Sequence, residues 1–283
     1  MSTGCNNRIC VISMVRNDAF FIEKWINYYG EQLGRKNLFL ILDGHDQPLP
    51  GKSEDINLIR VPHIELGRAG GDRNRARLVS YLARSLFHRY DMVIALDIDE
   101  FLVLDPRAGS NLCEYLGSRK TRYASLSALG LDVAQHTGQE EAVDIRKPFL
   151  EQRSFAHVSA RYTKAVVAAR PVIWGSGFHR VKGRNFHIDP NLYLFHFGMV
   201  DFERSNERAD NESLLNAGWE GHLGRRHEIY DLIINSTAIE GDDFFRKARK
   251  RQSLFRPLYA INKPGTLKEK PVIRIPERFR SIV

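Results

Sequence analysis

The sequence predicts an α/β fold built around a largely parallel sheet. Apolar runs at 8–15, 38–42, 56–61 and 92–96 are short and almost unbroken, as is typical of strands that helices cover on both faces. Amphipathic helical stretches follow the first and third runs, and this alternation favours parallel pairing through right-handed crossovers. With 283 residues, the chain forms one large domain or one domain with an appendage.

The first strand, predicted over 8–15, opens into Arg16-Asn17-Asp18, where Asn17 or Asp18 can cap the helix that follows. That helix carries an apolar stripe at helical spacing and ends at a glycine. The stripe consists of Ile22, Trp25, Ile26, Tyr29 and Leu33. A second strand over 38–42 stops at Asp43, and a third over 56–61 follows a turn rich in proline and glycine.

A segment rich in glycine and arginine, 65–74, leads into a second helix with Val79, Leu82, Ala83 and Leu86 on its inner face. Its glycines do not have the spacing of a dinucleotide-binding or P-loop motif. Glycines and arginines at the start of a helix nevertheless suit an anion. Arg73 and Arg77 are one turn apart and can both reach a phosphate; the alternative is a flexible loop with surface arginines.

The fourth apolar run ends in three carboxylates within four positions, Asp97, Asp99 and Glu100. Such acids repel one another unless positive charge lies between them. Residues two apart in an extended chain face the same side, so Asp97 and Asp99 can bind one ligand. Oxygen ligands at the carboxyl end of a strand suit Mg²⁺ or Mn²⁺, and the alternative is an acidic, solvated turn.

Beyond Glu100 the sequence predicts shorter elements. The chain is expected to turn away over 102–106 and to form a polar, irregular loop over 134–153. A strand over 123–129 is expected to stop there, and 163–168 and 172–174 are expected to pair as a hairpin. The other predicted elements are a short helix over 111–116, a last strand over 191–197, helices over 201–219 and 228–251, and an unstructured basic tail from about residue 263.

Composition indicates a globular protein, with 43% apolar and 27% charged residues. No apolar run approaches the ~18 residues of a membrane span. Three cysteines are too few for a disulfide framework, and residues 1–8 lack the apolar core of a signal peptide, so we expect a cytoplasmic protein.

The net charge of +8 permits contact with an anionic membrane surface. The basic run 246–251 is either a solvated helix face or a contact with the inner membrane face or a lipid carrier.

Four short motifs occur in a recognisable order along the chain. They are Val15-Arg16-Asn17-Asp18, then Asp43, then Asp97-Ile98-Asp99-Glu100-Phe101-Leu102, and finally Phe195-His196-Phe197. Together they resemble the GT-A-fold glycosyltransferases of the bacterial family-2-like group and the related family-92-type enzymes, over residues 8–205. The resemblance implies a GT-A catalytic domain over 1–200, with a helical, basic C-terminal extension over 201–283 packed on it. Two positions depart from the pattern, because Asn-Glu is commoner than Asn17-Asp18 and Tyr is usual at Phe197.

The resemblance implies a metal-dependent hexosyltransferase that moves a sugar from a nucleotide donor, expected to be a UDP-sugar, to a glycan or glycolipid in surface polysaccharide synthesis. A divalent cation held by carboxylates would stabilise the charge on the departing diphosphate. By resemblance, the metal is Mn²⁺ or Mg²⁺ on Asp99 and His196, and Asp97 either shares the metal or binds the ribose. His196 also has a plainer interpretation as a core histidine.

The remaining roles that the resemblance implies concern the donor and the acceptor. The residues expected to bind the nucleotide part of the donor are Arg16, Asn17, Asp18 and Asp43 for the nucleoside, and Arg73 and Arg77 for the diphosphate. An inverting reaction needs a base to take the acceptor hydroxyl proton, and the candidates are Asp132, Glu151, His179 and Asp189. We favour His179, which follows a Gly-Ser-Gly turn that exposes it. Glu100 either hydrogen-bonds the transferred sugar or caps the turn.

Two other classes of protein fit parts of the sequence. The run 93–100 also resembles the first motif of haloacid-dehalogenase-type phosphatases, in which Asp97 would be the nucleophile. Those enzymes need a threonine or valine where this chain has Phe101. A non-enzymatic basic binding module is the third possibility, but no nucleic-acid-binding motif supports it and we expect no nucleic-acid partner.

Overall fold

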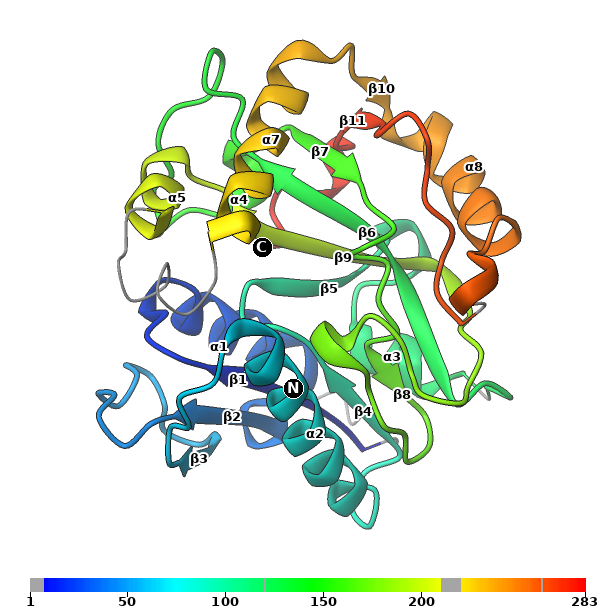
Figure 1. Cartoon of the computed structure of the whole chain (residues 1–283). Coiled ribbons are helices and arrows are strands. Elements are labelled where there is room, and N and C mark those ends of the chain that lie inside the picture. Colours follow the sequence, from blue (N-terminus) through cyan, green and yellow to red (C-terminus); the bar gives the residue numbers. More distant parts are fainter. Residues whose placement is uncertain (1–7, 120, 210–219, 261) are drawn as a thin grey trace.

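The computed structural model describes residues 8–119, 121–209, 220–260 and 262–283 (Figure 1). This part of the chain forms one mixed sheet of eleven strands flanked by helices, which confirms the predicted α/β class. The strands are β1 (Ile9–Val15), β2 (Leu38–Asp43), β3 (Asn57–Val61), β4 (Met92–Ala95), β5 (Glu100–Leu104), β6 (Ser125–Ala134), β7 (Phe155–Val158), β8 (Val167–Ala168), β9 (Ile188–Met199), β10 (Ile239–Glu240) and β11 (Val272–Arg274). The order along the sheet is β10-β11-β7-β6-β8-β4-β1-β2-β3, and β9 pairs with β5 and β6.

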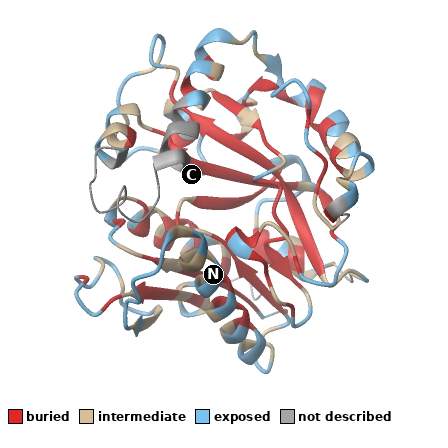
Figure 2. Ribbon diagram, in the orientation of Figure 1, coloured by how far each residue is buried: buried red, intermediate tan, exposed pale blue. Residues whose placement is uncertain are grey.

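The half of the sheet formed by β3, β2, β1 and β4 is parallel throughout. Neighbouring residues of its strands enter two different apolar clusters. Val11 lies in the cluster that contains Trp25 of α1 (Ala19–Leu33), whereas Cys10 and Ile12 lie in the cluster that contains Val79 of α2 (Arg68–Leu86). The two helices therefore cover opposite faces of the sheet, as the unbroken apolar runs predict, and Figure 2 shows these strands buried between them.

The start of α1 differs from the prediction. Asp18 occupies the N-cap position of α1, but its side chain makes no capping hydrogen bond, and Asn17 lies outside the helix with φ of +50°. The Asp18 carboxylate instead contacts the guanidinium of Arg204 at 2.5 Å, so a distant cation satisfies it in place of the helix amides. Gly34 ends the helix with φ of +84°, as predicted.

The second half of the sheet is mixed and contains three departures from the prediction. Residues 100–104 form β5, which pairs antiparallel with β9, whereas a turn was expected over 102–106. β6 does not stop at 129 but continues to Ala134, because Gly130 allows the backbone at Tyr162 and Thr163 to come close, and the Gly130 N–H donates to Thr163 Oγ1 at 2.9 Å. The predicted hairpin does not form, since β8 pairs with β4 and β6 instead.

The segment after β9 contains both helices and strands. The elements are α5 (Phe202–Ala209), α7 (Glu220–Asn235), α8 (Gly241–Leu254), β10 and β11. Two helices with β10 between them replace the predicted helix over 228–251, and β11 lies within the tail that was predicted to be unstructured, where it pairs antiparallel with β7. The expectations for residues 210–219 and 1–7 fall outside the described residues, and the domain boundary at 200 stays a prediction.

The remaining described α-helices are two short ones, α3 (Leu112–Gly117) where the sequence predicts one and α4 (Phe149–Gln152) at the end of the polar loop, and the described residues also form five single-turn 3-10 helices. No described helix combines the length and the apolar character needed to cross a membrane.

The close backbone approach at Gly130 predicts that Gly130→Ala destabilises the protein. A Cβ there would lie 2.2 Å from the carbonyl carbon of Tyr162 and 2.4 Å from the amide nitrogen of Thr163, and neither backbone atom can move freely. We expect the free energy of unfolding in urea to fall by about 2 kcal/mol or more. Gly138→Ala is the control, because its nearest contact would be 3.5 Å from the His136 side chain, and it should change stability by less than about 0.5 kcal/mol. Equal effects of the two substitutions would contradict this account.

Candidate active site

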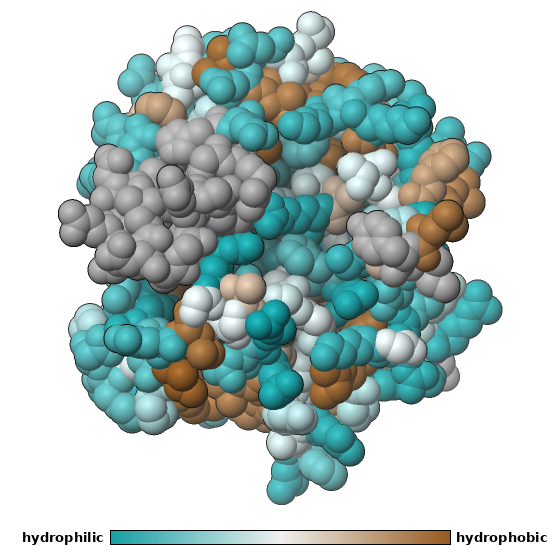
Figure 3. Space-filling model, in the orientation of Figure 1, coloured by the Kyte–Doolittle hydropathy of each residue, from teal (hydrophilic) through white to brown (hydrophobic). Residues whose placement is uncertain are grey.

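An open cleft of about 1580 Å³ lies where β1, β2, β3 and β4 end. Ligands of open α/β sheets bind at this edge of the sheet. The first turns of α2 and the segments 161–164 and 176–179 complete its walls. The cleft is larger than the roughly 300–1,000 Å³ of common small-molecule sites. In Figure 3, hydrophilic side chains gather around the hollow at the centre of the face that is shown.

The structure brings most of the predicted site residues together in this cleft. Those that line it are Arg16, Asn17, Asp18, Asp43, Asp97, Asp99, His179 and His196. Six others do not line it: Arg73 and Arg77 are exposed on α2, Glu151 is exposed on α4, and Glu100, Asp132 and Asp189 are buried outside the cleft lining.

Two cations that the sequence analysis did not identify neutralise Asp97. Arg75 Nη2 lies 3.1 Å from Asp97 Oδ1, and Lys164 Nζ lies 2.9 Å from Asp97 Oδ2. Burial by itself raises the pKa of Asp97, but the charges of Arg75 and Lys164 outweigh it and lower the pKa. Asp97 is therefore ionised and held from both sides at the base of the cleft.

Lys164 also explains how Glu100 can be fully buried. Its ammonium group lies 2.5 Å from Glu100 Oε1 and thus bridges Glu100 and Asp97. Burial is the largest influence on Glu100 and raises its pKa to about 7, while Lys164 acts in the opposite direction. Burial also disfavours the charge on Lys164, but Asp97 and Glu100 outweigh that and raise the pKa of Lys164. Glu100 does not line the cleft, and its predicted contact with the transferred sugar stays a prediction.

Asp99 faces a histidine from the far strand. His196 of β9 has its Nε2 atom 3.3 Å from Asp99 Oδ2, and its Nδ1–H donates to Asp132 Oδ1 at 2.6 Å. The ring also stacks on Tyr162, with centroids 3.8 Å apart and planes at 17°. Burial alone would lower the pKa of His196, but Asp99 and Asp132 outweigh it and raise the pKa to about 9. Asp132 therefore orients His196, and it does not face the cleft itself.

The far end of the cleft is built from the turns after β1 and β2. Arg16 donates to the backbone oxygen of Asp43 at 2.9 Å and forms an ion pair with Asp46 at 2.6 Å. The Asp43 carboxylate lies 3.1 Å from His63 Nδ1, and the Asn17 N–H donates to Gln47 Oε1. The two turns are thus tied into one wall.

Two basic residues of α2 line the cleft, Arg68 at its start and Arg75 two turns further on, and Arg75 is the one that lies beside Asp97. A helix turns about 100° per residue, so Arg73 and Arg77 share a face and Arg75 lies on the opposite one. Arg75 is half-buried beside Asp97 and Asp72, and its buried Nε atom has no hydrogen-bond partner among the described residues. Arg73 and Arg77, which the sequence analysis favoured, lie on the exposed face of α2, and their contact with the donor stays a prediction. Lys164, by contrast, has no local sequence signal.

His179 lies in the cleft wall in a neutral form. Its Nδ1–H donates to the backbone oxygen of Arg161 at 2.9 Å, which leaves Nε2 as a hydrogen-bond acceptor. Burial, followed by the charge of Lys164, lowers the pKa of His179 to about 3. Gly177 provides space for the ring, because a Cβ there would lie 2.8 Å from His179 Nε2. Of the other proposed bases, Asp189 is buried away from the cleft in contact with Arg119, and Glu151 does not line it.

The site has two groups suited to a divalent metal. No cluster of three or more His, Cys, Asp or Glu side chains poised for a metal occurs within the described part of the chain. Asp99 and His196 are nevertheless within 3.3 Å of each other at the cleft surface. Mg²⁺ and similar cations commonly take one or two protein carboxylates and complete their shell with substrate phosphates and water. These two residues fit such an ion once His196 is deprotonated, whereas both oxygens of Asp97 already face cations.

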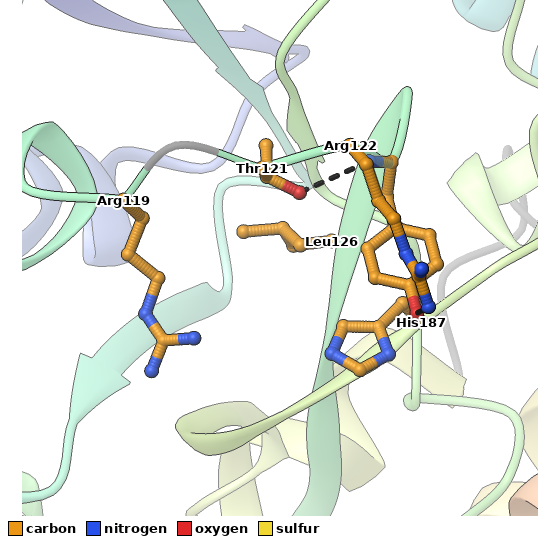
Figure 4. Close-up of a pocket in the computed structure, with 6 residues that line it drawn as sticks. Arg119, Thr121, Arg122, Leu126 and His187 are labelled. Carbon is orange, nitrogen blue, oxygen red and sulfur yellow. Dashed lines mark hydrogen bonds between the residues drawn. The ribbon is translucent and has the colours of Figure 1, made fainter.

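A second, smaller cavity of about 520 Å³ lies near the starts of β6 and β9 (Figure 4). Its wall includes Tyr123 and His187, whose rings stack with centroids 4.2 Å apart, and Thr121, whose hydroxyl accepts from the Tyr123 N–H at 3.1 Å. Arg119, one of its two arginines, forms an ion pair with the buried Asp189. None of the predicted site residues lines this cavity.

No family model and no curated protein matches the sequence. A search of solved structures finds weak similarity to three proteins, among others. They are a mannosyltransferase from Pyrobaculum calidifontis in complex with GDP-mannose and Mn²⁺ (14% identity, TM-score 0.37, covering 67% of this chain and 56% of that one), a mannose-1-phosphate geranyltransferase from Thermus thermophilus (9%, 0.30, 82% and 65%) and a mannosyltransferase from S. cerevisiae (12%, 0.27, 48% and 42%). This chain thus covers less than two thirds of each of those chains. Such likeness does not define an activity, because one fold supports many.

The raised pKa of His196 predicts a pH-dependent contribution to stability. Because the pKa rises from 6.5 to about 9 on folding, the folded state binds the extra proton, and the contribution is complete below pH 6.5 and is lost as the pH rises towards 9. With chelator present, the free energy of unfolding of the wild type should fall by up to about 3 kcal/mol over this range. His196→Gln should lose much less over the same range. Parallel pH profiles of the two proteins would show that His196 is not protonated in the folded state.

Proposed function

We propose that this protein is a glycosyltransferase that moves a sugar, a hexose in the simplest case, from a nucleotide-sugar donor to a saccharide acceptor. The observation that carries the proposal is the arrangement of the cleft. Asp99 and His196 lie together at one point of it, beside the cations Arg75 and Lys164, at the carboxyl ends of parallel strands. A diphosphate needs cationic and metal-bearing groups placed in this way.

The donor is proposed to lie along the cleft with its nucleoside against Arg16, Asn17 and Asp43 and its diphosphate over Asp97 and Asp99. Arg75 supports this direction, because its Nε is unsatisfied and its charge lies beside Asp97. In this arrangement Asp97 does not bind the metal but holds Arg75 and Lys164 in position for the phosphates. A UDP-sugar donor and a surface glycan or glycolipid acceptor remain proposals that rest on the resemblance of the sequence motifs.

Asp99 and His196 are the residues that would hold a divalent cation, and Asp132 fixes the ring of His196 through Nδ1. When bound, the cation supplies positive charge that stabilises the departing nucleoside diphosphate. Arg75 and Lys164 add charge on the other side without any proton transfer. With a cation held by Asp99 and His196, the leaving group would meet positive charge in a partly buried cleft, where each interaction is stronger than in water.

His179 is the proposed acceptor base. Its Nδ1–H is engaged by the Arg161 carbonyl, which leaves Nε2 to accept a hydrogen bond from an acceptor hydroxyl. Burial and the charge of Lys164 lower the pKa of His179 to about 3, which opposes proton uptake, so the role requires that the bound substrates raise this pKa. The role applies if transfer inverts the anomeric carbon, since that reaction needs one base.

The metal role of Asp99 is tested by Asp99→Asn. This substitution should lower glycosyl transfer by roughly 100-fold or more, because it removes an anionic metal ligand. In a thermal-shift screen of nucleoside diphosphates, the wild type should be stabilised more with Mn²⁺ than with chelator, and Asp99→Asn should abolish this difference. The same screen identifies the base of the nucleotide. Asp243→Asn, at an exposed position of α8, is the matched control and should leave both readouts unchanged. Full transfer by Asp99→Asn would remove the metal role, and hydrolysis of a generic phosphoester that needs Asp97 would support the phosphatase alternative.

A comparison within α2 tests which arginine reaches the donor. Arg75→Gln should weaken nucleoside diphosphate binding by about 10- to 100-fold, as expected for a lost charge-assisted hydrogen bond. Arg73→Gln and Arg77→Gln make the same chemical change on the exposed face and should leave affinity unchanged. Melting temperatures measured alongside separate a binding defect from a folding defect. A loss of affinity in Arg77→Gln with none in Arg75→Gln would reverse the proposed orientation of the donor.

A further inference from the structure

The chain has a long segment without a single acidic residue near its C-terminal end. Residues 244–268 contain eight lysines and arginines and no aspartate or glutamate. They are Arg246, Lys247, Arg249, Lys250, Arg251, Arg256, Lys263 and Lys268. This segment forms most of α8 and the chain that follows it. Such a run of like charge is costly to hold together unless it faces solvent or an anionic partner.

A second segment without acids lies against the first. Residues 179–187 include Arg180, Lys182 and Arg184 and no acid. The two segments are joined by Asn262 Nδ2, which donates to the backbone oxygen of Val181 at 2.9 Å, and by Arg256, which contacts Asn185 Oδ1 at 2.6 Å. Lys182 and Arg184 are exposed there, so the tertiary structure concentrates the charge further.

The cations on the outer side of α8 have no acidic partner within the part of the chain that the structure describes. Arg246, Lys247 and Lys250 are exposed and form no ion pair with a described residue. At the N-terminal end of α8, by contrast, the charges are paired, because Asp242 forms ion pairs with both Arg107 and Arg278. The charge on the outer side of α8 therefore remains available to a partner.

Large apolar side chains are exposed beside these cations. Leu254 and Phe255, at the end of α8, are 65% and 70% exposed, and Leu258 in the next turn is 96% exposed. Figure 3 shows apolar surface over the C-terminal end of α8, on the same face as the central cleft. Three large apolar groups in five positions, rimmed by cations, form a patch of the kind that marks an interaction site.

We propose that this basic–apolar surface, formed by Arg246, Lys247, Lys250, Leu254, Phe255 and Leu258, lies on an anionic lipid bilayer. Interfacial binding commonly needs two weak signals, insertion of apolar side chains and attraction of cations to anionic headgroups, and the surface supplies both. A polyanion such as nucleic acid would use the cations but would not require three exposed leucine and phenylalanine side chains. The proposal does not depend on glycosyl transfer, although a lipid-linked acceptor would then be close to the cleft.

Flotation of the full chain with vesicles tests the proposal without any activity measurement. The wild type should float with vesicles of phosphatidylglycerol and phosphatidylcholine, and far less with phosphatidylcholine alone. The bound fraction should fall steeply as salt is raised, because screening weakens the headgroup contacts. No flotation with the anionic vesicles, or equal flotation with both kinds, would overturn the proposal.

Two sets of variants separate the apolar and the cationic contributions. The triple variant Leu254→Ser, Phe255→Ser and Leu258→Ser should lower vesicle affinity at least tenfold, whereas Leu49→Ser, at a leucine 62% exposed on a distant loop, should not. The pair Lys247→Glu and Lys250→Glu should also lower vesicle affinity tenfold. The control pair Arg84→Glu and Arg89→Glu makes the same change in net charge on exposed residues elsewhere and should not lower vesicle affinity in this way. Wild-type affinity in the triple variant, or equal losses in the controls, would show that no specific surface meets the lipid.

Discussion

Three carboxylates within four residues at the end of β4 are the constraint on which this structure depends. Asp97, Asp99 and Glu100 can be held in and below the cleft only because each faces a cation from a distant segment. Arg75 comes from α2, Lys164 from the chain before β8, and His196 from β9, so the parallel and mixed halves of the sheet meet at this point. A buried charge that loses its partner costs about 3–5 kcal/mol, which makes the geometry of the site inseparable from the packing of the fold.

The parallel half of the fold could be predicted from the sequence because local pattern determines it. Strands covered on both faces are apolar throughout, and the stripe of α1 has helical spacing, so each element is visible in its own residues. The mixed half could not be predicted in the same way. Gly130 signals a turn in isolation, but in the structure it gives the chain at Tyr162 room to pass beside β6, a contact between segments far apart in sequence. β5 was missed since its partner, β9, lies almost a hundred residues further on.

The residues of the candidate site also divide into those with a local sequence signal and those that only the fold brings into place. The acidic strand end, the turns after β1 and β2, and His196 were visible as motifs, and the structure gathers them in one cleft. Lys164 has no motif of its own, and only the fold places it between Asp97 and Glu100. For α2, the sequence itself indicates that Arg75, and not Arg73 or Arg77, faces inward. The inner face of α2 includes Val79, and one turn before Val79 is Arg75, so the buried stripe already indicated which arginine faces inward.

The three acids are proposed to have different roles, with Asp99 and His196 holding a divalent metal and Asp97 paired with Arg75 and Lys164. A crystal structure of the protein with a nucleoside diphosphate and Mn²⁺, with the metal located by its anomalous scattering, measures this directly. We expect the Mn²⁺ between Asp99 and His196, with the diphosphate beside Arg75 and Lys164 still paired with Asp97. A metal bound to Asp97 with Lys164 displaced, or a diphosphate bound away from these residues, would contradict the account.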